Sequence, residues 1–155
     1  MGSYSTKKVH NFIDSFNVMT LSTVDPVEFE TRATPVFFAR MLNSFLFVSF
    51  EETKHAKNIL ENPMICASIT ADYQNYSQIR GAQIFGKCVK LSDPVKITAA
   101  ALVYFWKFPD VKAVFDSEAL KHVISVSWYL LKAGKIIFTD NTVKFGHREE
   151  YIFDF

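Results

Sequence analysis

The sequence predicts a mainly β protein, an antiparallel barrel of six to seven strands with flanking helices. Strand-like runs are joined mostly by short turns, and helical stretches are inserted between some of them. The regular alternation of strand and helix that is typical of a doubly wound sheet is missing. The 155 residues contain no repeat, linker or low-complexity segment, so we expect a single domain over residues 1–155.

The first third of the chain predicts one helix and three strands. Residues 9–16 have helical spacing of apolar side chains, and residues 18–24 are strand-like up to Asp25-Pro26. Residues 28–40 predict a long second strand, in which Pro35 indicates an edge position, a bulge or a strand end. Both faces of that strand carry apolar residues, so we expect it to be covered on both sides.

A hairpin turn at Asn43-Ser44 is expected to lead into the third strand, which ends near Phe50. Residues 53–61 then predict a helix that stops at Asn62-Pro63, because the residue before proline disfavours the helical conformation. Residues 64–71 predict the fourth strand.

The second half predicts a long fifth strand, a capped helix and a final pair of strands. Residues 78–91 form the strand, with Gly81 and Gly86 as bulges or bends. Asp93 caps a helix with Pro94 in its first turn, and a second short helix is expected over residues 110–122.

Residues 123–131 predict a strand that is broken near Ala133-Gly134 and resumes at residues 136–138 before a turn at residues 139–142. The alternating Tyr151, Phe153 and Phe155 suit a final edge strand or a dimer contact.

Composition excludes several function classes. The net charge of +1 lacks the basic footprint of a nucleic-acid-binding protein, and no apolar run is long enough to span a membrane. Cys66 and Cys88 stand alone without metal-ligand spacing, which predicts free thiols in the cytoplasm and no metal site. Aromatic residues reach 15%, which suits a packed β core, a subunit interface or a flat aromatic ligand.

The segment Thr53-Lys54-His55 is the strongest indication of a binding site. It places a hydroxyl and basic side chains at the start of a short helix between two strands. A helix N-terminus offers unpaired N–H groups and a partial positive charge, which favour a phosphate. A capped helix with a solvated basic face gives the same pattern.

The order of several motifs resembles the pyridoxamine 5′-phosphate oxidase-like family of FMN-binding split β-barrels. The resemblance covers nearly the whole chain and is carried by four segments, residues 21–23, 34–38, 45–50 and 53–63. A poorly characterised bacterial branch of that superfamily is similar in Ile79-Arg80-Gly81-Ala82-Gln83 and in Phe138-Thr139-Asp140-Asn141-Thr142.

The resemblance implies a homodimer that holds FMN in a groove between its subunits. It implies that the isoalloxazine ring is faced by Thr34, Pro35, Val36 and Phe37 and that the groove wall is formed by Phe50 and Glu51. It also implies that the phosphate is held by Thr53, Lys54 and His55, and that the following strand supplies polar contacts from Arg80 and Gln83. Arg32 is expected to stabilise the anionic reduced flavin, as a fixed positive charge would.

Two departures from the family pattern affect these expectations. Many members carry a lysine where His55 stands, and Glu51 and Glu52 place negative charge beside the phosphate site. The chain ends at Phe155 without a recognisable version of the C-terminal segment that pyridoxamine phosphate oxidases use for their substrate, so vitamin B6 oxidation is not expected.

We therefore expect a cytoplasmic, FMN-binding flavoprotein that acts as an oxidoreductase on an unknown small molecule. No catalytic residue is identified, because the sequence holds no Ser-His-Asp or Cys-His arrangement that can be argued. The alternative is a non-catalytic ligand-binding or sensing module of the same fold, with haem, deazaflavin or no cofactor.

Overall fold

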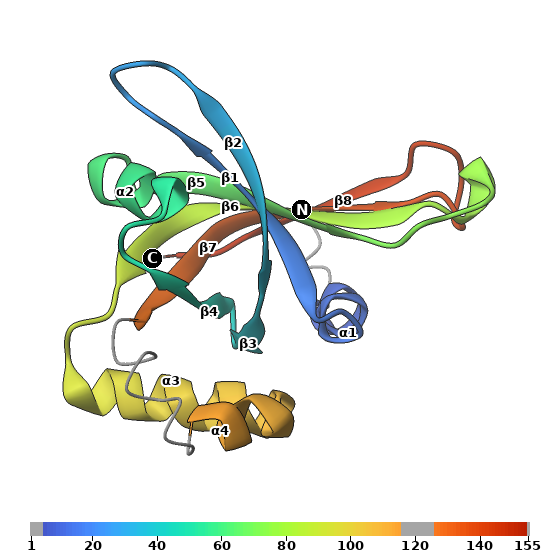
Figure 1. Cartoon of the computed structure of the whole chain (residues 1–155). Coiled ribbons are helices and arrows are strands. Elements are labelled where there is room, and N and C mark those ends of the chain that lie inside the picture. Colours follow the sequence, from blue (N-terminus) through green and yellow to red (C-terminus); the bar gives the residue numbers. More distant parts are fainter. Residues whose placement is uncertain (1–4, 116–125, 155) are drawn as a thin grey trace.

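The computed structural model describes residues 5–115 and 126–154, which form one strongly curled antiparallel sheet with helices around it (Figure 1). The strand order is β2-β1-β5-β6-β7-β4-β3, and β8 pairs with the remaining length of β7. The strands are β1 (Val18–Val24), β2 (Thr31–Phe37), β3 (Ala39–Met41), β4 (Ser44–Phe50), β5 (Met64–Thr70), β6 (Arg80–Lys90), β7 (Val126–Asp140) and β8 (Arg148–Ile152). The helices are α1 (Lys7–Asp14), α2 (Lys54–Glu61), the 3-10 turn η1 (Tyr76–Gln78), α3 (Pro94–Lys107) and α4 (Pro109–Phe115).

This architecture confirms the mainly β split barrel. The two edge strands, β2 and β3, are separated in the chain by Phe38 alone, so the sheet curls until its edges meet at one corner. Phe38 is fully buried there, and its N–H donates to the Asn17 carbonyl at 3.0 Å. Lys107 of α3 secures the same corner by donating from Nζ to the carbonyls of Phe16 (2.6 Å) and Phe38 (3.0 Å).

The barrel core follows from strict alternation along the strands. Inward-facing side chains are fully or nearly fully buried, among them Met19, Leu21, Ile69, Ile84 and Phe138. The helix α1 closes one end of the barrel with the apolar face that its spacing predicted, and it buries Val9, Phe12 and Ile13.

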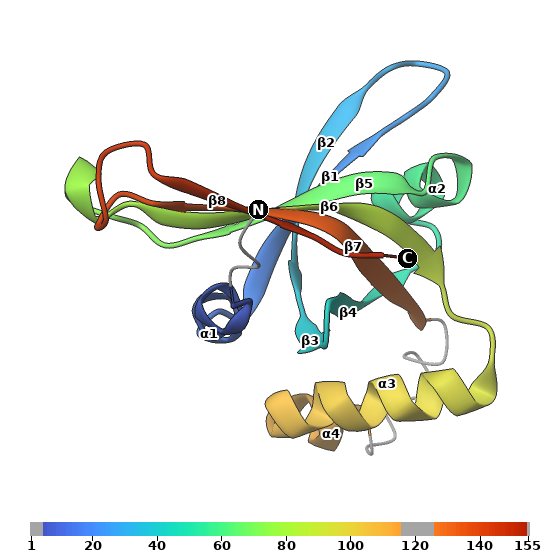
Figure 2. The same ribbon diagram turned by 180° about the vertical axis from the view of Figure 1, so that it is seen from behind.

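A second core lies outside the barrel, where α3 packs on β3 and β4 (Figure 2). Tyr104 of α3 meets Trp128 of β7 edge-on, with ring centroids 5.5 Å apart. Asp93 caps α3 by accepting from the Val95 N–H at 2.9 Å, and Pro94 occupies its first turn, as predicted.

The predicted strand over residues 28–40 is wrong in its extent. Residues 28–30 belong to a loop that Asp25 and Glu30 close, and Phe38 turns the chain from β2 into β3. Because the predicted second strand is divided into β2 and β3, the described residues contain one strand more than the upper predicted number of seven. The following turn uses Leu42 and Asn43 rather than Asn43-Ser44, because Met41 pairs with Ser44.

The paired strands β6 and β7 correct two further expectations. The register shifts at Gly86 as predicted, but the unpaired residue is Gly134 of β7, because Phe85 pairs with Lys135 and Gly86 with Ala133. The backbones are close there, since a Cβ on Gly86 would lie 2.0 Å from the Lys132 carbonyl oxygen. Gly81 lies in regular pairing and is no bulge. The predicted break at Ala133-Gly134 is wrong, because the register shift at Gly86 absorbs the extra residue and β7 continues through it.

Near the C-terminus, β8 is shorter than the predicted tail strand, and Phe153 packs against the barrel core instead. The predicted helix over residues 110–122 is observed as α4, from Pro109 to Phe115, within the described part. Its remainder, the predicted strand start at Val123, and Phe155 lie outside the described residues. No helix of the described ranges is long and apolar enough to cross a membrane.

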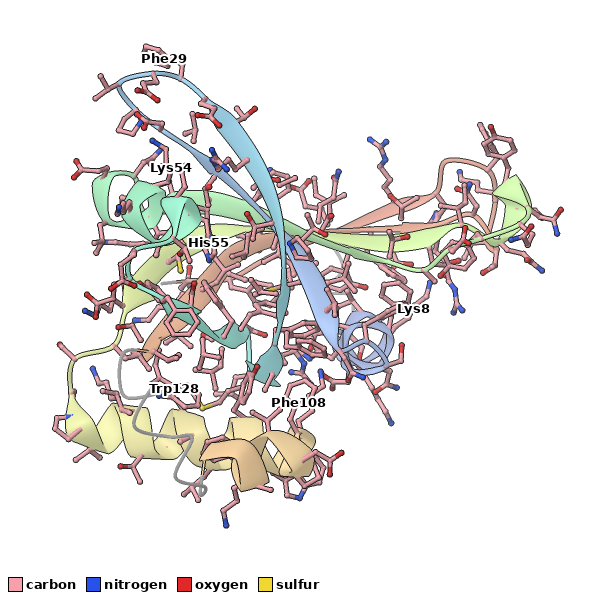
Figure 3. The ribbon with its side chains drawn as sticks, viewed as in Figure 1. Lys8, Phe29, Lys54, His55, Phe108 and Trp128 are labelled. Atoms are coloured by element: carbon pink, nitrogen blue, oxygen red, sulfur yellow. The ribbon has the colours of Figure 1, made fainter. Side chains whose placement is uncertain are left out.

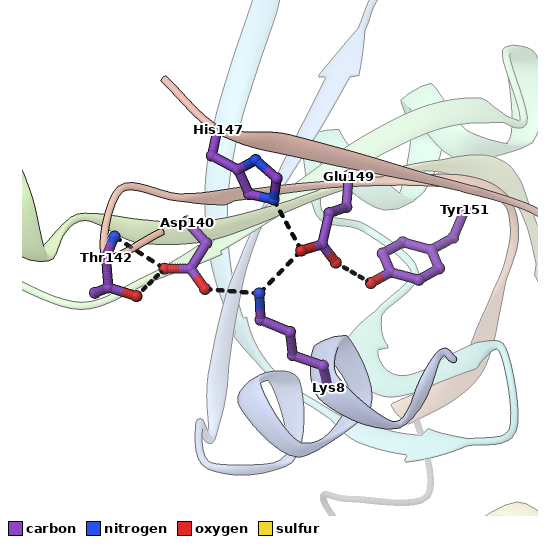
Figure 4. Close-up of polar contacts among 6 residues, drawn as sticks. All are labelled: Lys8, Asp140, Thr142, His147, Glu149 and Tyr151. Carbon is purple, nitrogen blue, oxygen red and sulfur yellow. Dashed lines mark hydrogen bonds and ion pairs between the residues drawn. The ribbon is translucent and has the colours of Figure 1, made fainter. Parts of the chain in front are cut away.

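A buried ionic cluster fixes α1 to the β7–β8 hairpin (Figure 4). Lys8 Nζ lies 2.9 Å from Asp140 Oδ2 and 2.9 Å from Glu149 Oε1. Both carboxylates are buried, and Tyr151 and Thr142 donate further hydrogen bonds to them. Burial opposes ionisation of Asp140 and Glu149, but these hydrogen bonds and Lys8 outweigh it and lower the pKa of both carboxyls.

Candidate functional site

The N-terminus of α2 is built as its sequence predicted. Thr53 is the N-cap, and its Oγ1 accepts from the Ala56 N–H at 3.4 Å. The helix buries Ala56 and Ile59 against the barrel and ends at Glu61, two residues before Pro63. Its first turn therefore follows the end of β4, and the leading N–H groups of that turn have no partner within the helix.

Two hydroxyls and an imidazole gather at this helix start. Ser49 Oγ lies 2.7 Å from His55 Nε2 and 3.1 Å from Thr53 Oγ1, and Thr53 Oγ1 lies 3.4 Å from the same His55 nitrogen. The sequence reasoning missed Ser49. Its position four residues before the N-cap, next to the end of a strand, is the signal that could have found it.

The positive charge of Arg32 on β2 acts on His55 at this site. Burial first, and then the positive charge of Arg32, lower the pKa of His55 below its ordinary value. The imidazole is therefore neutral near pH 7. Arg32 is held by Glu30, with Nη2 and Oε1 2.7 Å apart. Together, Arg32, Ser49, Thr53 and His55 are called the α2 cluster below.

Lys54 points away from the α2 cluster. Its Nζ lies 2.5 Å from Asp25 Oδ2 and 3.7 Å from Glu28 Oε2, on the loop between β1 and β2 (Figure 3). The hydrogen bond from Lys54, with two backbone hydrogen bonds, lowers the pKa of Asp25 to about 2. Lys54 thus braces the loop rather than joining the other basic groups.

The negative charge of Glu51 is compensated. Its Oε1 lies 2.6 Å from Lys90 Nζ and accepts a hydrogen bond from Ser127 at 2.6 Å, which lowers the pKa of the carboxyl. Phe50, just before it, is half exposed. Of the two acidic residues at positions 51 and 52, Glu51 is therefore already bound, by Lys90 and by Ser127 of β7.

The strand β2 is exposed along most of its length, so the expectation that both its faces are covered is wrong. Thr34 and Val36 are half-buried, whereas Pro35 is exposed. Phe37 is also exposed, although its ring meets Phe108 edge-on at 5.5 Å. The cause is the place of β2 at the sheet edge, where it has a single neighbour, β1.

Arg80 and Gln83 do not join the α2 cluster within one chain. Lys87, near the other end of β6, pairs with Met64 just after α2, which puts Arg80 roughly 23 Å further along the strand. Its guanidinium lies 5.7 Å from the Phe12 ring at the end closed by α1. Gln83 is exposed between Ser68 and Ile137.

A large groove lies on the outer face of the sheet, beside the start of β2. Its volume is about 560 Å³. We call it the outer groove. The residues that line it include Val24, Thr31, Met64, Cys66, Phe85 and Phe153. Among the described residues, no group of three histidine, cysteine or acidic side chains is placed to hold a metal ion.

The donor set of the α2 cluster fits a phosphate group. The Ser49 hydroxyl, the His55 imidazole and the free N–H groups of a helix start can donate to phosphate oxygens, and Arg32 adds a permanent positive charge. The Thr53 hydroxyl donates to the Phe50 carbonyl at 2.8 Å and caps the helix. Of the acidic side chains nearby, Asp25, Glu30 and Glu51 are ion-paired with Lys54, Arg32 and Lys90. The site is thus poised for an anion rather than a cation.

Comparison with known proteins places this geometry in context. The family profile described as "Pyridoxamine 5'-phosphate oxidase" matches residues 5–140. A UPF0306 protein from Photorhabdus laumondii is 26% identical over 140 residues, which are 90% of each chain.

Two solved structures share the fold. A haem-binding protein from Mycobacterium smegmatis superposes with a TM-score of 0.76 at 14% identity, over 98% of this chain. The chain spans only 59% of that protein's length. A FAD-binding protein from Mesorhizobium loti superposes with a TM-score of 0.68 at 11% identity, over 86% of this chain and 93% of its own.

Proposed function

The chain belongs to the pyridoxamine 5′-phosphate oxidase family, and on that premise we propose that it binds FMN and acts as a flavin-dependent oxidoreductase. The observation that carries the proposal is the α2 cluster, in which Ser49, Thr53 and His55 meet within 3.4 Å under the positive charge of Arg32. The FAD-binding neighbour supports a flavin on this fold.

Each group of the α2 cluster has a role toward the phosphate. The Ser49 hydroxyl and the first N–H groups of α2 donate to its oxygens, and Thr53 holds the start of the helix in place as its N-cap. His55, neutral in the free protein, takes up a proton from solvent when the dianion binds, because the imidazolium is then paired. Arg32 contributes charge without a change in protonation.

The protein's part in the reaction is binding and orientation. The flavin, when bound, supplies the transfer of hydride or electrons to and from a small molecule. The β2 residues from Thr34 to Phe37, of which Pro35 and Phe37 are exposed, follow Arg32 along the same strand, so they provide a surface for the ring once the phosphate is fixed. The substrate is not specified by these residues.

We also propose that the active form is a cytoplasmic homodimer. An exposed edge strand and an open apolar groove on the adjoining face support a second subunit there. Cys66 and Cys88 are both free, which suits a reducing compartment.

A second candidate function is a non-catalytic module that binds haem, deazaflavin or another ligand. It is favoured by one observation, the haem-binding neighbour that superposes over 98% of this chain. This candidate predicts no turnover with a nicotinamide cofactor, whatever the ligand.

The test is the absorbance spectrum of the protein after incubation with FMN and desalting, followed by anaerobic addition of NADH or NADPH. The proposal predicts about one retained FMN per chain, bleached by at least one of the two donors. Retained flavin that neither donor reduces would favour the non-catalytic module. Loss of all FMN on desalting, or a haem band in the purified protein, would contradict FMN binding.

A further inference from the structure

A cavity of about 260 Å³ lies between α3 and the sheet, away from the α2 cluster. Its floor includes Leu46, Leu130 and Val89. These three lie side by side on β4, β7 and β6, because Leu130 pairs with both of the others. The first half of α3 forms the roof, where Ala99 and Ala100 line the cavity. The walls are therefore mostly aliphatic.

The small side chains of α3 account for this space. The second half of the helix packs closely on the sheet, where Tyr104 and Phe105 meet Trp128 edge-on. The first half carries alanines in place of such rings, so Leu130 and Val89 beneath it stay only half-buried. A methylene group takes about the volume of a water molecule, roughly 30 Å³, so the cavity holds an alkyl chain of about nine carbon atoms.

Two lysines stand at the rim of this cavity. Lys96 comes from the first turn of α3, and Lys132 follows Leu130 two residues along the same face of β7. Within the part of the chain that the structure describes, neither ammonium group has an ion pair or a hydrogen bond. Asp93, close to Lys96 in the chain, is used as the helix cap and accepts from the Val95 N–H.

A third lysine adds to the positive charge at the rim. Lys87 of β6 lies directly opposite Lys132 in the antiparallel pairing. Like charges in directly opposed positions destabilise a sheet. Lys87 also lacks an ion pair among the described residues, so this charge is not offset from within them. A bound anion would neutralise it.

An aliphatic cavity with a cationic rim is complementary to an aliphatic carboxylate. Its alkyl chain is buried against Leu46, Val89 and Leu130, and binding strengthens with each methylene group removed from water. Its carboxylate accepts charge-assisted hydrogen bonds from the lysines. We propose that this cavity binds a medium-chain fatty acid, with the chain between α3 and the sheet and the carboxylate at Lys96 and Lys132.

This site is separate from the α2 cluster and does not rest on the proposed flavin. Lys132 pairs with Ser44 at the start of β4, whereas Ser49 lies roughly 17 Å further along that strand. The binding of fatty acid and of FMN can therefore be scored independently in one sample.

Calorimetric titration with three probes tests the two halves of the site. Decanoate carries both chain and charge, decan-1-ol carries the chain alone, and butyrate carries the charge on a short chain. Decanoate is expected to bind once per chain, at least tenfold more tightly than either of the others. Equal affinity for butyrate would overturn the cavity as the site of the chain, and equal affinity for decan-1-ol would overturn the role of the lysines. Absence of decanoate binding would overturn the whole proposal.

Lys132→Gln tests the position of the carboxylate. The variant is expected to bind decanoate at least fivefold more weakly than wild type and to bind decan-1-ol equally well. Lys144→Gln is the matched control, because Lys144 is another exposed lysine and lies on the turn before β8, outside the cavity. It should change neither affinity.

Ala99→Leu tests the position of the chain by filling the cavity from α3. It is expected to weaken both decanoate and decan-1-ol at least tenfold. Thr98→Leu is its control, since Thr98 is exposed at the neighbouring position and does not line the cavity. Decanoate affinity that survives both Lys132→Gln and Ala99→Leu overturns the proposal. Lys132→Gln, at an exposed position, decides the matter alone if Ala99→Leu does not fold.

FMN retention after desalting is measured in the same variants and is expected to match wild type. A wild-type protein that binds decanoate but loses FMN would contradict the flavin proposal alone. One that retains FMN but does not bind decanoate would contradict the fatty acid site alone.

Discussion

At the scale of single residues, His55 decides how the α2 cluster responds to pH. Its pKa in the free protein is lowered by burial and by Arg32, so the ring is neutral near pH 7. A bound phosphate dianion raises that pKa, and binding then takes up a proton. FMN affinity should therefore be full below the pKa of the bound form and fall as the pH rises through it.

The corresponding prediction concerns His55→Gln. Between pH 6.5 and 8, wild-type affinity for FMN should decline with pH, while the variant should be weaker by about tenfold at pH 6.5 and flat across the range. Quenching of flavin fluorescence measures both. Lys57→Gln is the control, since Lys57 is exposed one turn further along α2. A parallel decline in His55→Gln would remove the role given to the imidazole.

Lys8 is the residue on which the buried ionic cluster depends. Lys8→Met leaves Asp140 and Glu149 buried and without their cation, although Tyr151, Thr142 and His147 still contact them. Because Lys8 is itself 45% exposed, we expect a loss of about 1–3 kcal/mol at pH 7.

The pH dependence of that loss follows from the carboxyl groups. Both have lowered pKa values in the folded protein, so their stabilising contribution is present above the ordinary carboxyl range and is lost as the pH falls. Urea unfolding of Lys8→Met should therefore differ from wild type most at pH 7, and the difference should shrink only as the pH falls below the ordinary carboxyl range and both groups become protonated. A difference that stays the same at pH 7 and in that acidic range would show that packing, not charge, is lost.

At the scale of elements, the bulge between β6 and β7 gives the sharpest prediction. Gly86→Ala puts a Cβ 2.0 Å from the Lys132 carbonyl oxygen and 2.8 Å from its carbon, so two backbones must separate. We expect a loss of about 2–3 kcal/mol in the free energy of unfolding.

Gly81→Ala is the matched control on the same strand. Its Cβ would meet nothing closer than the Ile69 carbonyl oxygen at 3.5 Å, which is an ordinary contact. Denaturant unfolding should show less than about 0.5 kcal/mol of change for it. A similar cost at both glycines would contradict the close approach of the β7 backbone at Gly86.

These elements also show what local sequence can predict. Thr53 and Pro63 delimit α2, and Asp93 and Pro94 start α3, because caps and proline act through neighbouring backbone groups. The end of β2 could not be predicted in this way. It is set by the Phe38 N–H, whose partner Asn17 lies 21 residues earlier in the chain.

The same distinction applies to the site. The helix start with Thr53 and His55 follows from local chemistry, and Ser49 lies only four residues before the N-cap. Arg32, by contrast, joins them from β2, far away in the chain. Lys54 was expected at the phosphate and is instead held by Asp25 across the β1–β2 loop. Charges that pair across the fold cannot be assigned from spacing along the chain.

At the scale of the whole molecule, one face of the barrel is covered by helices and another is exposed. The helices α3 and α4 cover β3 and β4, whereas the outer groove and the edge strand β2 are exposed. The ligand cluster lies at the border of the open face. Binding and assembly are thus expected to depend on one another.

The central claim is that the α2 cluster holds the phosphate of FMN. It is tested most directly by titrating the protein with FMN and with riboflavin, which lacks the phosphate. The account predicts that FMN binds about 100-fold more tightly, and that Arg32→Ala reduces this ratio by at least tenfold without changing riboflavin affinity. Equal affinity of the wild-type protein for FMN and riboflavin would contradict it.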